Sequence, residues 1–154
     1  MKINVKNKNH LLFYLNSLTT KKTLMKFLQI KYININHDSL IGKMIIDTNK
    51  NFFQPEGFLH GGIITSLAES IGSSLSLIYV NQTLFNVFNI EISVNHIKNI
   101  KTGILFAVAK MIHKGKTLHC INVKILNNNK HIISFCKMTN IIISKKISHN
   151  NDRN

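Results

Sequence analysis

Apolar and polar positions alternate in short blocks along most of the chain, and these blocks predict short helical pieces, two strands, one long helix and then four strands. Apolar residues recur at roughly helical spacing over residues 10–27. Six other ranges are rich in Ile, Val or Phe and are separated by short polar breaks: residues 28–36, 39–47, 85–97, 103–113, 117–127 and 131–144. Because the breaks are short, we expect neighbouring strands to pair in the antiparallel direction.

Residues 52–80 contain the second helical region and differ in composition from the rest of the chain. Lys and Asn account for 40 of the 154 residues, yet this range contains neither. It holds four of the seven glycines and the only proline, Pro55. Burial of a helix explains the missing lysines, but it does not explain the small residues.

The helix in this range has two different faces when its residues are placed at about 100° intervals. One face predicts an apolar stripe: Ile64, Leu67, Ala68, Ile71, Leu75 and Ile78. The opposite face carries small residues around one carboxylate: Gly62, Thr65, Ser66, Glu69, Gly72, Ser73 and Ser76. Small side chains let a backbone or ligand approach closely. We therefore expect this second face to be buried or to line a ligand site, with ordinary exposure as the alternative.

Length and composition predict one domain over residues 1–154, with a core over about 23–144 and a polar tail over 148–154. The apolar fraction is 44% and the mean hydropathy +0.05, which is enough for a packed core. No window approaches about 18 uninterrupted apolar residues, so we expect no membrane-spanning helix. With two cysteines and no recognisable secretion signal, a reducing cytoplasm is the expected location.

The formal charge of +14 suggests a nucleic-acid partner, but the type of basic residue argues against one. Of the 20 basic residues 19 are lysine, and Ile, Asn and Lys together make up 65 of 154 residues, the signature of AT-rich codons. Nucleic-acid sites favour arginine, and the chain has only Arg153. We expect solvated surface lysines and no nucleic-acid partner. A basic rim for a phosphorylated small molecule is one alternative, and a polyanion-binding protein is another.

The segment before the helix, Gln54 to Gly62, is suited to binding a carbonyl group. The first turn of a helix has unpaired N–H groups and a partial positive charge, and glycine leaves them accessible. The Gly61 N–H could polarise a carbonyl oxygen there, and Gln54 and His60 could add hydrogen bonds. A tight turn without ligand is the alternative.

Glu69 is one of only six acidic residues and a candidate nucleophile or general base; a surface glutamate is the alternative. Gly61 and Glu69 are about 12 Å apart along one helix at 1.5 Å per residue. Reacting groups must lie about 3 Å from a shared carbonyl. If both act, we therefore expect Glu69 to come from a second subunit.

The motifs Gln54-Pro55-x-Gly57-x-Leu59-His60-Gly61-Gly62 and Leu67-Ala68-Glu69-Ser70-Ile71-Gly72-Ser73 resemble those of hotdog-fold acyl-CoA thioesterases. The resemblance extends from about Thr23 to Ile143 and is strongest to the 4-hydroxybenzoyl-CoA and 1,4-dihydroxy-2-naphthoyl-CoA type. It implies an α+β hotdog fold, in which an antiparallel five- to six-stranded sheet wraps around one long central helix. It also implies a homodimer or homotetramer with active sites at the dimer interface.

The resemblance assigns roles to four residues around the start of the helix. Glu69 matches the catalytic carboxylate, and Gly61 matches the helix-terminal N–H that polarises the thioester carbonyl. Gln54 and His60 match residues that position the thioester or its attacking water.

Four further positions match substrate-binding residues of the resembling family. Ser73 matches a hydroxyl near the acyl group or water, and His96 matches a histidine of the third strand. The family commonly continues His-Arg-Pro there, whereas this chain has Ile97-Lys98-Asn99. Lys98 can bind phosphate only as a point charge, and Lys116 stands where relatives often have another arginine.

Other chemistry lacks its sequence signature. The chain has no G-x-S-x-G, G-x-G-x-x-G or Walker motif. His113, His119 and Cys120 form an incomplete ligand set, so we expect neither metal nor cofactor. Cys120 and Cys136 are expected to be small buried hydrophobic residues. The resemblance therefore implies a hydrolase that converts an acyl-CoA, with an aromatic or hydroxylated acyl group, to free acid and CoA. A non-hydrolytic acyl-thioester binder or a hotdog dehydratase is the alternative.

Overall fold

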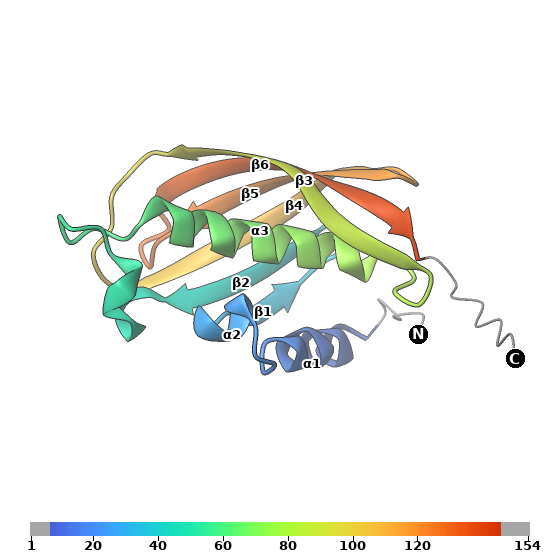
Figure 1. Ribbon diagram of the computed structural model, residues 1–154, viewed down its shortest axis with the longest axis horizontal. Coiled ribbons are helices and arrows are strands. Elements are labelled where there is room, and N and C mark those ends of the chain that lie inside the picture. The colour runs from blue at the N-terminus through green and yellow to red at the C-terminus, as the bar shows by residue number, and fades with distance from the viewer. Residues whose placement is uncertain (1–6, 146–154) are drawn as a thin grey trace, which may run out of the picture.

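An antiparallel sheet curves around one long helix in a computed structural model that describes residues 7–145 (Figure 1). The helices are α1 (Lys8–Leu18), α2 (Leu24–Phe27) and α3 (Gly61–Ile78). The strands are β1 (Lys31–Ile35), β2 (Ser39–Ile45), β3 (Phe85–His96), β4 (Ile104–Lys114), β5 (Leu118–Leu126) and β6 (Ile132–Ser144). Two 3₁₀ turns, η1 (Ile46–Thr48) and η2 (Lys50–Phe52), follow β2. The strand ranges expected from the sequence are confirmed to within about three residues at each end.

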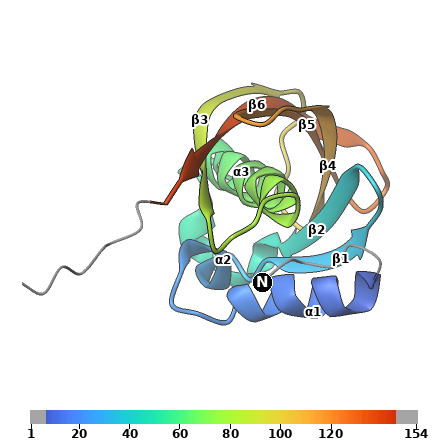
Figure 2. The ribbon, with the colours of Figure 1, turned by 90° about the vertical axis from the view of Figure 1, so that its right-hand side faces the viewer.

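The amino-terminal helical region consists of two short helices, in agreement with the short helical pieces expected from the sequence. Asn7 caps α1 by accepting a hydrogen bond from the His10 N–H, and Thr23 caps α2 in the same way from Lys26. A side-chain cap satisfies one of the unpaired N–H groups of a first turn, so each cap defines a separate helix start. α1 lies against β1, on the side of that strand away from α3 (Figure 2).

The strand order is β1-β2-β4-β5-β6-β3, and every neighbouring pair is antiparallel. The expectation that successive strands pair is wrong for β3 and β4, because β3 pairs with β6 at the edge of the sheet. Three strand spacings, about 14 Å, separate β3 from β4. A link over residues 97–103 can extend to about 23 Å. A short connection therefore crosses the end of the curved sheet without forcing the two strands to pair.

The apolar stripe of α3 faces the sheet, as the helical spacing predicts. All six of its residues are buried, and they pack against inward-facing residues of the central strands such as Leu105, Ala107 and Val123. By length and composition alone α3 could cross a membrane, with a mean hydropathy of 1.2 over 18 residues. Half of that window is buried inside the chain, and its position in Figure 2 is that of a core helix.

Two buried hydrogen bonds attach α3 to the sheet. The Ser74 and Tyr32 hydroxyls lie 2.6 Å apart. Asn140 donates from Nδ2 to Ser76 Oγ over 2.8 Å, and both residues are fully buried. Asn89 donates in turn to Asn140 Oδ1. Because an unpaired buried polar group costs about 1–3 kcal/mol, these pairings favour one position of the helix against the strands.

Candidate active site

The loop before α3 is a tight turn closed by backbone hydrogen bonds. The Gln54 N–H donates to the Phe58 carbonyl, and the Gly57 N–H donates to the Gln54 carbonyl. Gly57 has a φ of +76°, a conformation that side chains with a Cβ rarely adopt. The Gln54 side chain is exposed, and its Nε2 reaches the carbonyl of Leu59 in the same loop at 3.5 Å.

His60 is the amino-terminal cap of α3. Its Nδ1 accepts a hydrogen bond of 2.9 Å from the Gly62 N–H. An acceptor nitrogen carries no proton, so the proton of the neutral ring resides on Nε2. The ring is exposed and can donate from Nε2 to a bound molecule. The family resemblance implies a positioning role for His60, and the structure adds that His60 caps the helix.

Gly61 is the first residue of α3 and lies against the ring of His96. A Cβ built on Gly61 would lie 2.7 Å from His96 Nε2, so any larger residue would displace the ring. The Gly61 N–H has no hydrogen-bond partner among residues 7–145. It lies where the helix has a partial positive charge. Two of the expected site residues are therefore brought together at an available donor.

The orientation of His96 is set by a residue that the sequence analysis missed. His96 Nδ1 lies 2.9 Å from Ser134 Oγ, and Ser134 is fully buried on β6. The two residues face one another because β3 pairs with β6. Nothing in the local sequence distinguishes this serine from others in strands. Its role depends on a contact between residues 38 positions apart.

Glu69 does not reach Gly61 within one chain. α3 is continuous between them, so they remain about 12 Å apart along the axis. Glu69 is exposed, and among the described residues its carboxylate makes no hydrogen bond or ion pair. Gly62, Ser66, Glu69 and Ser73 follow one another at intervals of three or four and form a stripe on the outer side of α3, which we call the small-residue stripe.

The second face of α3 is thus divided rather than uniform. Gly72 and Ser76 are buried against the sheet, where a Cβ on Gly72 would overlap Met138 Sδ. Glu69 and Gly62 are exposed, and Ser66 and Ser73 are partly buried. The division arises because the sheet curves far enough around α3 to cover one flank of that face. A helical wheel contains no information on that curvature.

The two lysines expected near the substrate lie at opposite ends of α3. Lys98 follows β3, and its backbone N–H donates to the carbonyl of Ile133, next to the Ser134 that holds His96. Lys116 lies in the turn between β4 and β5, beside Tyr79 at the carboxyl end of the helix. Eighteen residues of helix span about 27 Å. Within one chain, Lys98 therefore lies toward the Gly61 end of α3 and Lys116 toward the other end.

The cysteines differ in burial. Cys136 is fully buried, as expected, and burial raises the pKa of its thiol to about 11. Cys120 is only half-buried, which corrects the expectation of a buried residue, because it points to the outer face of β5. Within residues 7–145 no three His, Cys, Asp or Glu side chains are grouped closely enough to hold a metal ion.

Comparison with known proteins gives one consistent match. Residues 56–133 match the family model described as the thioesterase superfamily. The 1,4-dihydroxy-2-naphthoyl-CoA hydrolase of Listeria monocytogenes is 32% identical over 110 residues, which cover 68% of this chain and 85% of that one. The proofreading thioesterase EntH of Cronobacter turicensis is 30% identical over 118 residues, 77% of this chain and 84% of that one.

Solved structures share the same architecture. Thioesterase HI1161 of Haemophilus influenzae superposes with a TM-score of 0.81 at 25% identity, covering 90% of this chain and 94% of that one. A mutant of thioesterase PA1618 of Pseudomonas aeruginosa also gives 0.81, at 27% identity and with 87% and 94% covered. The six-stranded antiparallel sheet with its long central helix is the arrangement that these structures have in common with this chain.

Proposed function

We propose that this chain, which belongs to the thioesterase superfamily and has its hotdog fold, hydrolyses an acyl-CoA thioester to a free acid and CoA. Membership makes it a hydrolase acting on thioesters; the CoA carrier and the residue roles are the proposal. The observation that carries the proposal is the unpartnered Gly61 N–H, with the His96 ring packed against it at the positive end of α3.

The first step is polarisation of the thioester carbonyl. Its oxygen accepts a hydrogen bond from the Gly61 N–H, and the partial positive charge of the helix stabilises the oxyanion that forms during attack. His60 Nε2 lies one residue before this N–H, and with Gln54 it positions the thioester or water. His96, held by Ser134, limits how the acyl group lies over Gly61.

The second step is attack by water or by a carboxylate, for which we propose Glu69 of the partner subunit. A general base would take a proton from water as the oxygen adds to the carbonyl, and the tetrahedral intermediate would then expel the CoA thiolate. A nucleophile would instead form an acyl anhydride that water cleaves. Label found in Glu69 after single-turnover hydrolysis in ¹⁸O-labelled water would establish the anhydride route, since water that attacks the Glu69 carbonyl of the anhydride leaves its oxygen there.

The proposed aromatic acyl group and CoA carrier are supported by the name of one relative and by two residues of this chain. The relative from Listeria monocytogenes is named for an aromatic, hydroxylated acyl-CoA. Ser73 lies one helical turn beyond Glu69 and could bind such a hydroxyl. Lys98 is exposed near His96 and could neutralise a CoA phosphate.

The proposed location is the cytoplasm. The two cysteines are free thiols, which fits the reducing conditions there.

A shared active site requires a homodimer or a homotetramer, and β3 offers a surface for pairing. β3 is an edge strand of 12 residues, and its side chains Phe88 and Ile90 are more than half exposed. A long exposed edge with apolar side chains is prone to pair with another strand. Pairing along β3 would also bring the small-residue stripe of α3 close to a second subunit.

The experiment that tests the function measures free thiol released from a panel of aromatic and aliphatic acyl-CoA substrates. The Glu69→Gln variant is expected to keep the fold and lose at least about 100-fold in kcat, because it lacks the base or nucleophile. Asp38→Asn, which likewise replaces a carboxylate by an amide but between β1 and β2 and away from β3, serves as the control. Turnover by Glu69→Gln close to that of the control would contradict the assignment, and thioester binding without turnover by the native chain would favour a non-hydrolytic binder.

A further inference from the structure

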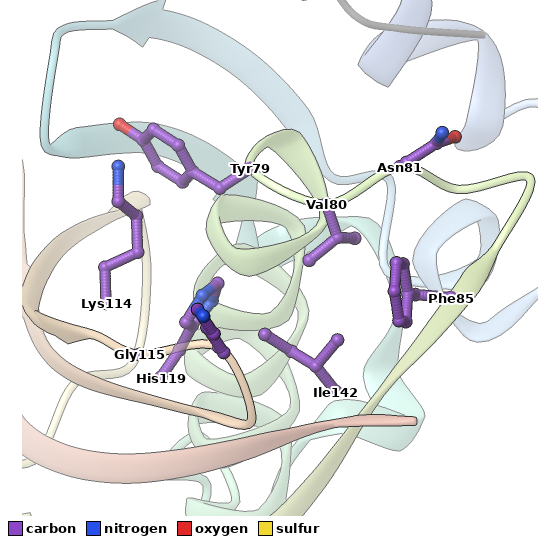
Figure 3. Close-up of a pocket in the computed structure, with 9 residues that line it drawn as sticks. Tyr79, Val80, Asn81, Phe85, Lys114, Gly115, His119 and Ile142 are labelled. Atoms are coloured by element: carbon purple, nitrogen blue, oxygen red, sulfur yellow. The ribbon is translucent and has the colours of Figure 1, made fainter. Parts of the chain in front are cut away.

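A cavity of about 480 Å³ lies at the carboxyl end of α3, far from Gly61. Its walls come from the end of the helix, the start of β3, the turn between β4 and β5, and β6 (Figure 3). Val80, Phe85 and Ile142 provide an apolar surface. The volume is sufficient for a molecule with one or two aromatic rings, within the usual range of small-molecule sites.

His119 in this cavity carries an unsatisfied polar atom. The residue is only 2% exposed, and its Nδ1 is the one buried side-chain nitrogen or oxygen without a hydrogen-bond partner among residues 7–145. Its neighbour on β6, Asn140, is by contrast satisfied by Ser76 and Asn89. A buried polar group without a hydrogen-bond partner destabilises the fold. A bound molecule that supplies the missing partner removes this cost and therefore binds more tightly.

The charged groups at the cavity are cationic. Lys114 extends toward the ring of Tyr79 (Figure 3). Its Nζ lies 4.5 Å from the ring centroid. Lys116 lines the same wall, and no carboxylate is among the lining residues. The Asp38 carboxylate near Tyr79 is instead 3.9 Å from the ammonium of Lys110. The cavity thus combines an apolar wall, the ammonium groups of Lys114 and Lys116, and one imidazole nitrogen without a hydrogen-bond partner.

We propose that this cavity binds a small apolar carboxylate, a molecule with an aromatic or short hydrocarbon body and one carboxylate group. The body would pack against Val80, Phe85 and Ile142. The carboxylate would accept a hydrogen bond from Nδ1–H of the protonated His119 ring, which also hydrogen-bonds to the Gly115 backbone, and would lie close to Lys114. The free acid released by thioester hydrolysis has this chemistry, but the inference rests on the cavity and does not require the proposed function.

Within one chain this site is separate from the one at Gly61, because the length of α3, about 27 Å, lies between them. Lys116 therefore acquires a second interpretation. The family resemblance implies a place for Lys116 beside the substrate, whereas in the structure it lines the same cavity as His119. A carboxylate at this site would meet cations from the β4–β5 turn and no residue of the loop before α3.

The test measures binding of benzoate to the full-length protein by calorimetry, with benzamide as the neutral ligand of the same shape. Benzoate is expected to bind at least about 10-fold more tightly than benzamide, as a hydrogen bond to a charged group is worth more than one to a neutral group. His119→Phe, which keeps the ring volume, should weaken benzoate binding by about 10-fold or more. Lys114→Met should weaken it by no more than about 5-fold, because its ammonium is exposed. The control Lys124→Met removes the same charge from an exposed site outside the cavity and should have no effect.

A measurement on the native chain avoids dependence on the folding of His119→Phe. The ¹⁵N shift of His119 Nδ1 should move during a benzoate titration and saturate with the same Kd as calorimetry gives. Equal binding of benzoate and benzamide, or an unmoved Nδ1 signal at saturation, would overturn the proposal. Tighter binding of inorganic phosphate or of adenosine 3′,5′-bisphosphate than of benzoate would also overturn it, because the site would then recognise phosphate rather than an apolar acid.

Discussion

At the scale of single residues, the start of α3 depends on the absence of one side chain. Gly61 leaves room for His96, and His96 is in turn held by Ser134 on the next strand. His60 satisfies the Gly62 N–H and so leaves the Gly61 N–H as the available donor. Together these contacts place one N–H donor and two imidazole rings around the first residue of α3.

Gly61→Ala should therefore reduce kcat by about 100-fold or more, the range observed when an oxyanion donor is lost. The added methyl group displaces His96 and covers the N–H. The double variant Gly61→Ala/His96→Ala should regain the melting temperature lost by the single variant, because the overlap is removed, yet stay inactive. Full activity of Gly61→Ala at normal substrate affinity would contradict the role of this donor.

His119 is expected to make stability depend on pH. Burial lowers the pKa of its imidazole below 6.5, and the positive charge of Lys114 lowers it further. A hydrogen bond to the Gly115 backbone raises the pKa but does not cancel these effects. The unfolded chain takes up a proton at about pH 6.5 whereas the folded chain resists it. The free energy of unfolding should thus be highest above that pH and fall as the pH is lowered.

Urea denaturation between pH 5 and pH 8 measures this effect, and His119→Phe should flatten the curve. His131→Gln removes an exposed imidazole on the turn between β5 and β6 and serves as the control. The same acid dependence in both variants would exclude His119 as its source.

At the scale of elements, α3 combines a packed stripe with a flank of small residues that fit closely against β5 and β6. Gly72 lies at the point of closest approach, where a Cβ would overlap Met138 and come within 3.4 Å of Val123. Ser76 and Asn140 then fix the helix along its axis. The position of the small-residue stripe, and hence of Glu69, depends on this packing.

Gly72→Ala should lower the free energy of unfolding by up to about 2 kcal/mol. Alanine favours a helix over glycine by about 1 kcal/mol, but overpacking a close contact costs about 1–3 kcal/mol. When Met138 is first replaced in Met138→Ala, the same change at Gly72 should be neutral or stabilising. Urea denaturation of the four chains measures both values. If Gly72→Ala raised the free energy of unfolding in the native background, the helix would not be closely packed against Met138 at this position.

At the scale of the whole molecule, the fold of one chain keeps Glu69 away from Gly61. Glu69 is exposed and about 12 Å along the helix from Gly61, and no described residue bridges that distance. β3 leaves one edge of the sheet unpaired beside α3. Both features are explained if two chains pair and each contributes half of every site.

Complementation tests this arrangement. Mixing inactive Glu69→Gln chains with inactive Gly61→Val chains under conditions that exchange subunits should restore activity. Each mixed dimer then has one site with an intact Glu69 and an intact Gly61, so about half the native activity per mixed dimer is expected. Native mass spectrometry verifies the mixed dimers. If they formed and stayed inactive, each chain would have to build its own site.

The sequence by itself determined the elements and most of the candidate site residues. The strand ranges and the six buried positions of α3 follow from periodicity, because burial of one face of an element is a local property of its residues. The loop before α3, with its glycines, and the lone carboxylate at Glu69 are likewise visible in sequence, because glycine and acidic residues are scarce elsewhere.

Only the tertiary structure decided how these parts meet. It placed β3 beside β6, joined His96 to Ser134, divided the second face of α3 and separated Lys116 from Lys98. It also left His119 Nδ1 without a partner in a cavity. Each of these outcomes depends on the curvature and order of the sheet, which bring together residues far apart in the chain. No local pattern of hydrophobic and polar positions encodes such contacts.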